Sequence, residues 1–110
     1  MIPRLMVLTD RRALRRRRGL SEVVQECADA GLTHVVVREH DLPTAERSDL
    51  VAELAAHCGL TVLASRCPDP GAHGLHLAAT QPLPPGRRPP VLGRSCHDVA
   101  ELARAAAEGC

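Results

Sequence analysis

The chain contains no phenylalanine, tyrosine or tryptophan among its 110 residues. Without aromatic rings it cannot stack the bases of single-stranded nucleic acid, and its core must be built from leucine, valine and alanine. It also contains no lysine, since all fourteen basic residues are arginines. This excludes Schiff-base chemistry and a P-loop lysine. The net charge of +1 gives no overall attraction to nucleic acid, so we expect no nucleic-acid partner.

Long apolar runs and paired cysteines are also lacking. The longest apolar runs are a few residues, whereas a membrane-spanning helix needs about 20, so we expect no membrane association. The five cysteines are odd in number and show no C-x-x-C spacing. Together with the absence of a signal peptide, this favours free thiols in the cytoplasm. Cys58, Cys67 and Cys96 are predicted to be small buried side chains.

Short apolar runs alternate with helical patterns along the chain. Five runs predict strands: 4–9, 33–38, 61–65, 74–77 and 91–95. Apolar spacing predicts three helices: one from an N-cap at Ser21 to a stop at Gly31, one over 45–58 capped by Thr44, and one over 99–107 opened by His97-Asp98. This repeat predicts an α/β fold with a parallel sheet, forming one domain over residues 1–110.

A barrel and a doubly wound sheet both fit this repeat. No Gly-x-Gly-x-x-Gly segment follows any predicted strand, which removes the best marker of a dinucleotide-binding fold. A complete barrel needs eight units and about 250 residues. We therefore expect a partial TIM (β/α)8 barrel of about five units.

Charged residues follow directly on a run of three valines, residues 35–37. Such a run predicts a strand buried on both faces, and α/β proteins bind ligands at the carboxyl ends of their strands. The Arg38 guanidinium suits phosphate geometry, so we expect it to contact the ligand; alternatively, it pairs with Glu39 or another acid. Glu39 is expected to be an ion-pair partner. His40 is either an acid or phosphate donor, or a solvated loop histidine.

The end of the fifth strand offers Ser95 and His97. Ser95 can donate to a phosphate, and the helix that follows can bind an anion at its start; alternatively, His97 only opens that helix. His73 and His76 lie three residues apart on a strand and point to opposite faces, so no metal site is expected there. The six arginines of residues 11–19 form either a solvated loop or a surface for anionic ligands or nucleic acid.

Four segments resemble the thiamine-phosphate synthase/TenI superfamily of (β/α)8 barrels. They are L-M-V-L-T-D-R at 5–11, A-G-L-T-H-V-V-V-R-E-H at 30–40, H-G-L-H-L at 73–77 and L-G-R-S-C-H at 92–97. The resemblance implies a phosphorylated thiazole or pyrimidine as the ligand. The substrate-binding residues that it implies are Arg38, His40, Ser65, Ser95 and His97.

The differences from the synthases concern Mg²⁺. A synthase joins a pyrimidine diphosphate to thiazole phosphate and uses Mg²⁺ held by carboxylates. In the implied alignment its Gln is replaced by Val36, its Lys by His40, its Asn-Asp pair by Ser65-Arg66, and its second Asp ligand by a residue near Gln81. These side chains cannot supply the carboxylate charge that Mg²⁺ requires. The resemblance therefore favours the TenI branch, which isomerises thiazole phosphate by proton transfer without a cofactor.

Two alternatives remain: a divergent Mg²⁺-dependent synthase, and a non-catalytic truncated barrel that only binds a ligand or partner. In TenI proteins the catalytic His lies on the sixth strand and the phosphate-binding loops follow strands seven and eight. We therefore expect this chain to be the N-terminal portion of a barrel, truncated before strand six, with its catalytic residues unknown. Unpaired first and fifth strands predict a homo-oligomer through exposed sheet edges.

Overall fold

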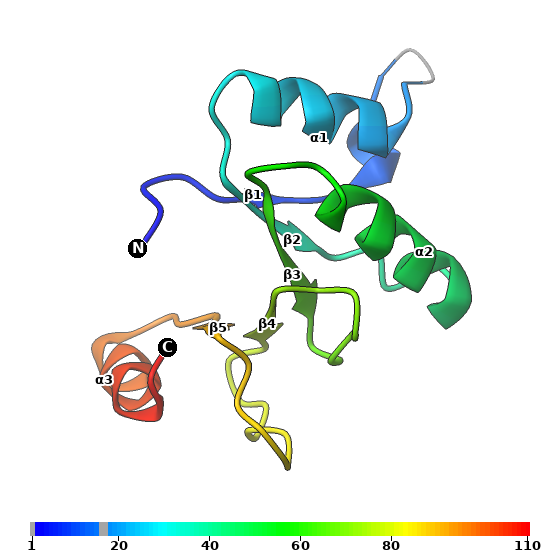
Figure 1. Cartoon of the computed structure of the whole chain (residues 1–110). Helices are drawn as coiled ribbons and strands as arrows, with labels where there is room; N and C mark the ends of the chain where they lie inside the picture. The colour runs from blue at the N-terminus through cyan, green and yellow to red at the C-terminus, as the bar shows by residue number, and fades with distance from the viewer. Residues whose placement is uncertain (1, 16–17) are drawn as a thin grey trace.

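The computed structural model describes residues 2–15 and 18–110, and in these residues five strands form one sheet (Figure 1). The strands are β1 (Val7–Leu8), β2 (His34–Val37), β3 (Thr61–Ser65), β4 (Gly74–Leu77) and β5 (Val91–Arg94). The helices are α1 (Leu20–Asp29), α2 (Thr44–Ala55) and α3 (Val99–Glu108), with a 3₁₀ turn, η1 (Arg11–Ala13), after β1. All neighbouring strands are parallel and follow one another in chain order. The predicted α/β fold with a parallel sheet is confirmed.

Helices α1 and α2 cover one face of the sheet, and the main core lies between these two helices and the sheet (Figure 1). Its buried side chains are Val24 of α1, Val51 and Leu54 of α2, Val35 and Val37 of β2, Val62 of β3, and Leu60. Val36 points to the opposite face, where it lies beside Leu63 and is also fully buried. The prediction that β2 is buried on both faces is confirmed.

The third helix lies apart from α1 and α2, beside β5 (Figure 1). It begins where predicted: the Asp98 carboxylate caps it by accepting a hydrogen bond from the Glu101 N–H at 2.8 Å. Arg94 is the last residue of β5, and its guanidinium pairs with the carboxylate of Glu108 on α3 at 2.7 Å. Arg94 also donates to the Ala78 carbonyl oxygen at 2.9 Å. One buried cation thus holds the loop after β4 against α3.

The predicted N-cap of the first helix is wrong. The helix starts two residues earlier, with Gly19 at the N-cap position and Ser21 inside its first turn. The Ser21 hydroxyl is buried and has no hydrogen-bond partner in the described part of the chain. Leu20 packs against the core, so apolar contact determines the start of the helix rather than the capping preference of serine.

The predicted bounds of the second helix also need correction. Pro43, not Thr44, is the N-cap residue, and its carbonyl oxygen accepts a hydrogen bond from the Arg47 N–H at 3.0 Å. The helix ends at Ala55, three residues before Cys58, because the chain turns toward Gly59, where φ is +84°.

The cysteine prediction is wrong as well. Cys58 and Cys67 are exposed, since each lies in a turn next to a regular element. Cys96 is only half-buried.

The first strand is shorter than predicted because its partner begins late. Val7 lies opposite Val35, and β2 starts only one residue earlier, at His34. Residues 4–5 therefore extend past the start of β2 and have no strand to pair with.

Candidate functional site

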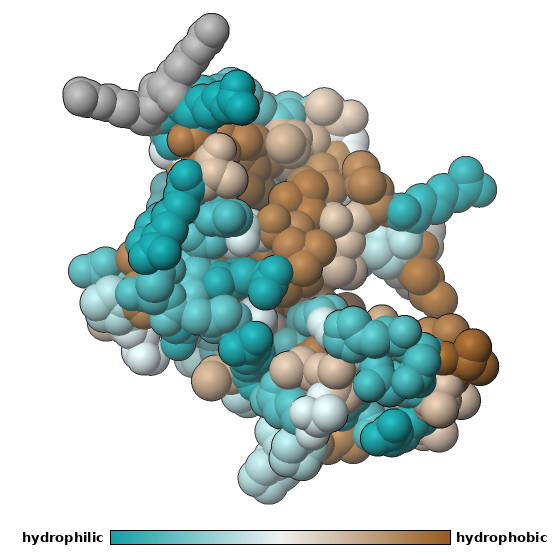
Figure 2. Space-filling view, turned by 180° about the vertical axis from the view of Figure 1, so that it is seen from behind, coloured by the Kyte–Doolittle hydropathy of each residue, from teal (hydrophilic) through white to brown (hydrophobic). Residues whose placement is uncertain are grey.

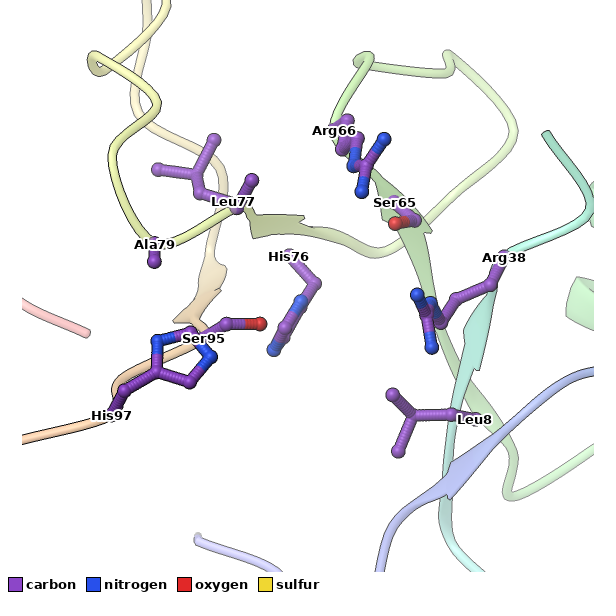
Figure 3. Close-up of a pocket in the computed structure, with 10 residues that line it drawn as sticks. Leu8, Arg38, Ser65, Arg66, His76, Leu77, Ala79, Ser95 and His97 are labelled. Atoms are coloured by element: carbon purple, nitrogen blue, oxygen red, sulfur yellow. The ribbon is translucent and has the colours of Figure 1, made fainter.

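A cavity of about 350 Å³ lies at the carboxyl ends of the strands, on the sheet face opposite α1 and α2. Four of the five predicted binding residues line it: Arg38, Ser65, Ser95 and His97. Arg66 and His76 line it too, with Leu8 and Leu77 as apolar neighbours. Figure 3 shows Arg38 and Leu8 on one side, Ser95 and His97 on the other, and His76 between them.

The sheet register explains this convergence. Ser65 lies opposite His76, and His76 lies opposite Gly93. Continuing the β2–β3 register places Arg38 beside Ser65, so these positions form one row across the sheet. A Cβ atom at Gly93 would lie 2.8 Å from His76 Cδ2. Glycine thus leaves the space that the His76 imidazole occupies.

The two arginines of the cavity have no acidic partner. In residues 2–15 and 18–110, neither the Arg38 nor the Arg66 guanidinium forms an ion pair or a hydrogen bond. No carboxylate lines the cavity. The alternative in which Arg38 pairs with Glu39 is therefore wrong, and the cavity carries uncompensated positive charge that suits an anion.

Glu39 instead fixes the loop after β1. Its carboxylate accepts hydrogen bonds from the Thr9 hydroxyl at 2.8 Å, the Arg11 N–H at 2.9 Å and the Arg11 guanidinium at 3.1 Å. Burial alone would raise the pKa of Glu39, but these hydrogen bonds and the Arg11 charge lower it below its usual value. The prediction that Glu39 is an ion-pair partner is confirmed.

Three of the four arginines that the structure describes in the arginine-rich loop are paired with local acids. Arg11 and Arg12 pair with Asp41, and Arg18 pairs with Glu22 and Glu26 of α1. Arg16 and Arg17 lie outside the described residues. None of the loop residues that the structure describes lines the cavity.

His40 stands behind the cavity wall rather than in it. Its Nε2 atom lies 3.1 Å from the Ser65 hydroxyl oxygen, so it orients a side chain that does line the cavity. Burial, followed by the charges of Arg66, Arg47 and Arg38, lowers the pKa of His40 below its ordinary value.

His76 is the imidazole at the centre of the cavity. Burial, and after it the Arg38 charge, lowers its pKa. Its ring forms no hydrogen bond with the described residues. The neutral imidazole that these conditions favour at neutral pH can donate or accept one hydrogen bond.

Arg66 has an unusual backbone conformation for a residue with a side chain. Its φ is +68°, in the left-handed region. Two hydrogen bonds hold it there: the Arg66 N–H donates to the His76 carbonyl oxygen at 2.8 Å, and the Gln81 side-chain amide donates to the Arg66 carbonyl oxygen at 2.6 Å. Residues held in sparsely populated conformations cluster at functional sites.

The start of α3 is not a second anion site. His97 is exposed, and its backbone N–H donates to the Glu101 carboxylate at 2.6 Å. The Asp98 carboxylate occupies the N-cap of the same helix. The Glu101 and Asp98 carboxylates already accept hydrogen bonds at this terminus, and His97 and Ser95 contribute to the cavity as lining residues.

Arg66 and His76 were absent from the residues predicted to bind. The alternation in Gly74-Leu75-His76-Leu77 indicates that His76 faces away from both leucines, which is a readable signal. Arg66 gives no such signal, because nothing in the sequence predicts a positive φ at an arginine.

Comparisons with known proteins gave no assignment. The sequence matches no protein-family model, and no curated protein or solved structure matches it significantly. In residues 2–15 and 18–110, no three His, Cys, Asp or Glu side chains are grouped to hold a metal ion. None of the helices described has the length and apolar character needed to cross a lipid bilayer.

Proposed function

We propose that this chain binds the phosphate group of a small phosphorylated molecule, and that the molecule is thiazole phosphate, as the resemblance to TenI proteins of thiamine biosynthesis implies. The observation that carries the proposal is the pair of arginines without acidic partners, Arg38 and Arg66, in a cavity that no carboxylate lines. An oxyanion between two guanidinium groups forms charge-assisted hydrogen bonds, which are about twice as strong as neutral ones.

The rest of the cavity suits a small ring attached to that phosphate. Ser65 and Ser95 offer hydroxyl donors, and Leu8, which is half-exposed, offers apolar surface. Its volume of about 350 Å³ is near the lower end of the range for small-molecule sites. The resemblance implies a catalytic histidine on a sixth strand; in the part of the chain described, we propose instead that His76 of β4 supplies the imidazole for proton transfer.

The fold supports a barrel assignment within the same proposal. Strand order follows chain order without reversal, whereas a doubly wound sheet reverses its order at the ligand site. Helices α1 and α2 pack on the same face. We therefore propose a partial (β/α)8 barrel whose cavity corresponds to the ligand-binding end.

The divergent synthase is less well supported. Mg²⁺ binds carboxylates and substrate phosphates, and the lining residues, two of them arginines, do not fit that ion.

Calorimetry tests the proposal with three ligands: thiazole phosphate, the corresponding thiazole alcohol, and inorganic phosphate. We expect thiazole phosphate to bind most tightly and the alcohol not to bind measurably. Arg38→Gln should weaken binding by about 10- to 100-fold, the loss expected for a hydrogen bond to a charged group. Arg87→Gln, in the proline-rich loop outside the cavity, is the matched control and should change nothing.

Equal binding of the alcohol and the phosphate, or unchanged binding by Arg38→Gln, would contradict the phosphate site. Binding of inorganic phosphate alone would support an anion site and reject thiazole phosphate as the ligand. Tautomerase activity is assayed separately by following thiazole phosphate isomerisation, with His76→Gln as the variant expected to bind but not to isomerise.

A further inference from the structure

The strongest hydrogen-bonding groups of the anion cavity can only donate. They are the guanidinium groups of Arg38 and Arg66, and both residues are exposed to solvent. In Figure 2 the surface is hollowed above α3, the helix that Ser95 and His97 precede, and hydrophilic and hydrophobic residues meet there. Among the residues that the structure describes, those lining the cavity include no aspartate or glutamate.

Main-chain carbonyl oxygens around the cavity already accept hydrogen bonds from within the protein. The Gln81 side-chain amide donates to the Arg66 carbonyl oxygen at 2.6 Å. The buried Arg94 guanidinium donates to the carbonyl oxygens of Ala78 at 2.9 Å and Ala79 at 3.5 Å. Backbone N–H groups donate to the carbonyl oxygens of further lining residues: Arg38, Ser65, His76 and Leu77. A ligand that brings no donor therefore leaves none of these acceptors unpaired.

The remaining polar side chains of the cavity can take either role. A serine hydroxyl both donates and accepts, so Ser65 and Ser95 can turn their protons toward an anion. For Ser65 this is compatible with its contact to His40, whose Nε2 atom lies 3.1 Å away and can donate to the hydroxyl oxygen. A neutral imidazole carries one N–H, and the His76 ring has no partner in the described chain that would hold this N–H elsewhere.

Sulfate and inorganic phosphate differ by one proton. At about pH 8 both are tetrahedral ions with about two negative charges, but hydrogen phosphate keeps one P–OH donor and sulfate has none. A site rejects sulfate where an acceptor that pairs with this P–OH would be left unpaired or would repel the ion. The part of the cavity that the structure describes has no carboxylate to do this, and its exposure to solvent lets a P–OH reach water.

We propose that the cavity binds doubly charged tetrahedral oxyanions as a class, and that it binds sulfate at least as tightly as inorganic phosphate. This inference rests on the proposed phosphate site and states its ligand class. Two guanidinium charges match the two charges of either ion. A phosphate monoester such as thiazole phosphate joins this class when its second proton has left, because all of its phosphate oxygens are then acceptors.

Calorimetry with sodium sulfate and sodium phosphate at about pH 8 tests the inference, with chloride holding the ionic strength constant. We expect the dissociation constant for sulfate to be equal to or below that for phosphate. Each ion should weaken the binding of the other, because both occupy one site. Arg38→Gln should weaken the binding of both ions by the same factor, about 10- to 100-fold. Arg87→Gln, outside the cavity, is the matched control and should bind both ions as the parent chain does.

Ser95→Asp introduces the acceptor that the cavity lacks. Its carboxylate can accept a hydrogen bond from the P–OH of hydrogen phosphate but repels sulfate. Phosphate should then bind at least about tenfold more tightly than sulfate. Circular dichroism checks that this variant is folded, and the comparison of the two ions on the parent chain needs no variant.

Sulfate binding at least about tenfold weaker than phosphate binding in the parent chain would overturn this inference and leave the phosphate site standing. Binding of neither ion would remove the phosphate site itself, and this inference with it. Unequal losses for the two ions in Arg38→Gln, or an unchanged preference in folded Ser95→Asp, would also overturn the inference.

Discussion

Replacing Arg66 with glycine separates the strain of the site from its charge. Arg66 has a φ of +68°, and a left-handed conformation costs a residue with a Cβ atom about 1–2 kcal/mol. Glycine has no such penalty but loses about 0.5–1 kcal/mol through its greater freedom in the unfolded chain. We therefore expect Arg66→Gly to raise the free energy of unfolding by roughly 0–1.5 kcal/mol.

The same change removes one of the two cavity cations. A hydrogen bond to a charged group contributes about 1.5–3 kcal/mol, so the dissociation constant for thiazole phosphate should rise by about 10- to 100-fold. Urea unfolding measures the stability and calorimetry measures the affinity. Arg66→Ala is the control, since it removes the charge and keeps the strain: it should bind as weakly as Arg66→Gly and be less stable. A glycine variant less stable than the alanine variant, or one that binds with parental affinity, would refute this account of Arg66.

Three further changes probe neighbouring features. Gly93→Ala places a Cβ 2.8 Å from His76 Cδ2, so it should lower the free energy of unfolding by about 1–3 kcal/mol and shift the His76 ring signals in NMR; unchanged ring signals would contradict the packing. Glu39→Gln weakens a buried hydrogen-bonded carboxylate and should cost about 1–3 kcal/mol in urea unfolding, more than Asp41→Asn, which alters an exposed pair; equal losses would refute the role of Glu39. The pKa values of His40 and His76 are lowered in the folded chain, so the unfolded chain binds more protons and stability should fall as pH drops below about 6.5. Urea unfolding at pH 5.5 and 7.5 measures this loss, and equal stability at the two pH values would contradict it.

Local patterns in the sequence were enough to predict most of the fold. The valines of β2, the short aliphatic runs of β3 to β5, and Asp98 before α3 each carry a signal within a few residues. Errors arose where distant contacts decide. Leu20 starts α1 because the core lies beneath it, and β1 is short because β2 begins only at His34.

The candidate site was predictable where its residues follow strands that local patterns reveal. Arg38 and Ser95 follow strand ends, and parallel strands bring such ends together whatever the details of the loops. Register across the sheet adds His76, since only strand pairing shows that it lies opposite Ser65. The backbone conformation of Arg66 depends on hydrogen bonds to residues 76 and 81, which no local pattern encodes.

Amide NMR during a titration with thiazole phosphate tests the central claim most directly, because it locates the ligand as well as detecting it. We predict that the backbone signals of Arg38, Ser65, Arg66, Ala78 and Ser95 shift together and saturate with one dissociation constant. Signals of Arg12 and Arg15, in the loop outside the cavity, should stay in place. Shifts confined to that loop, or no saturable shift at the strand ends, would contradict the phosphate site.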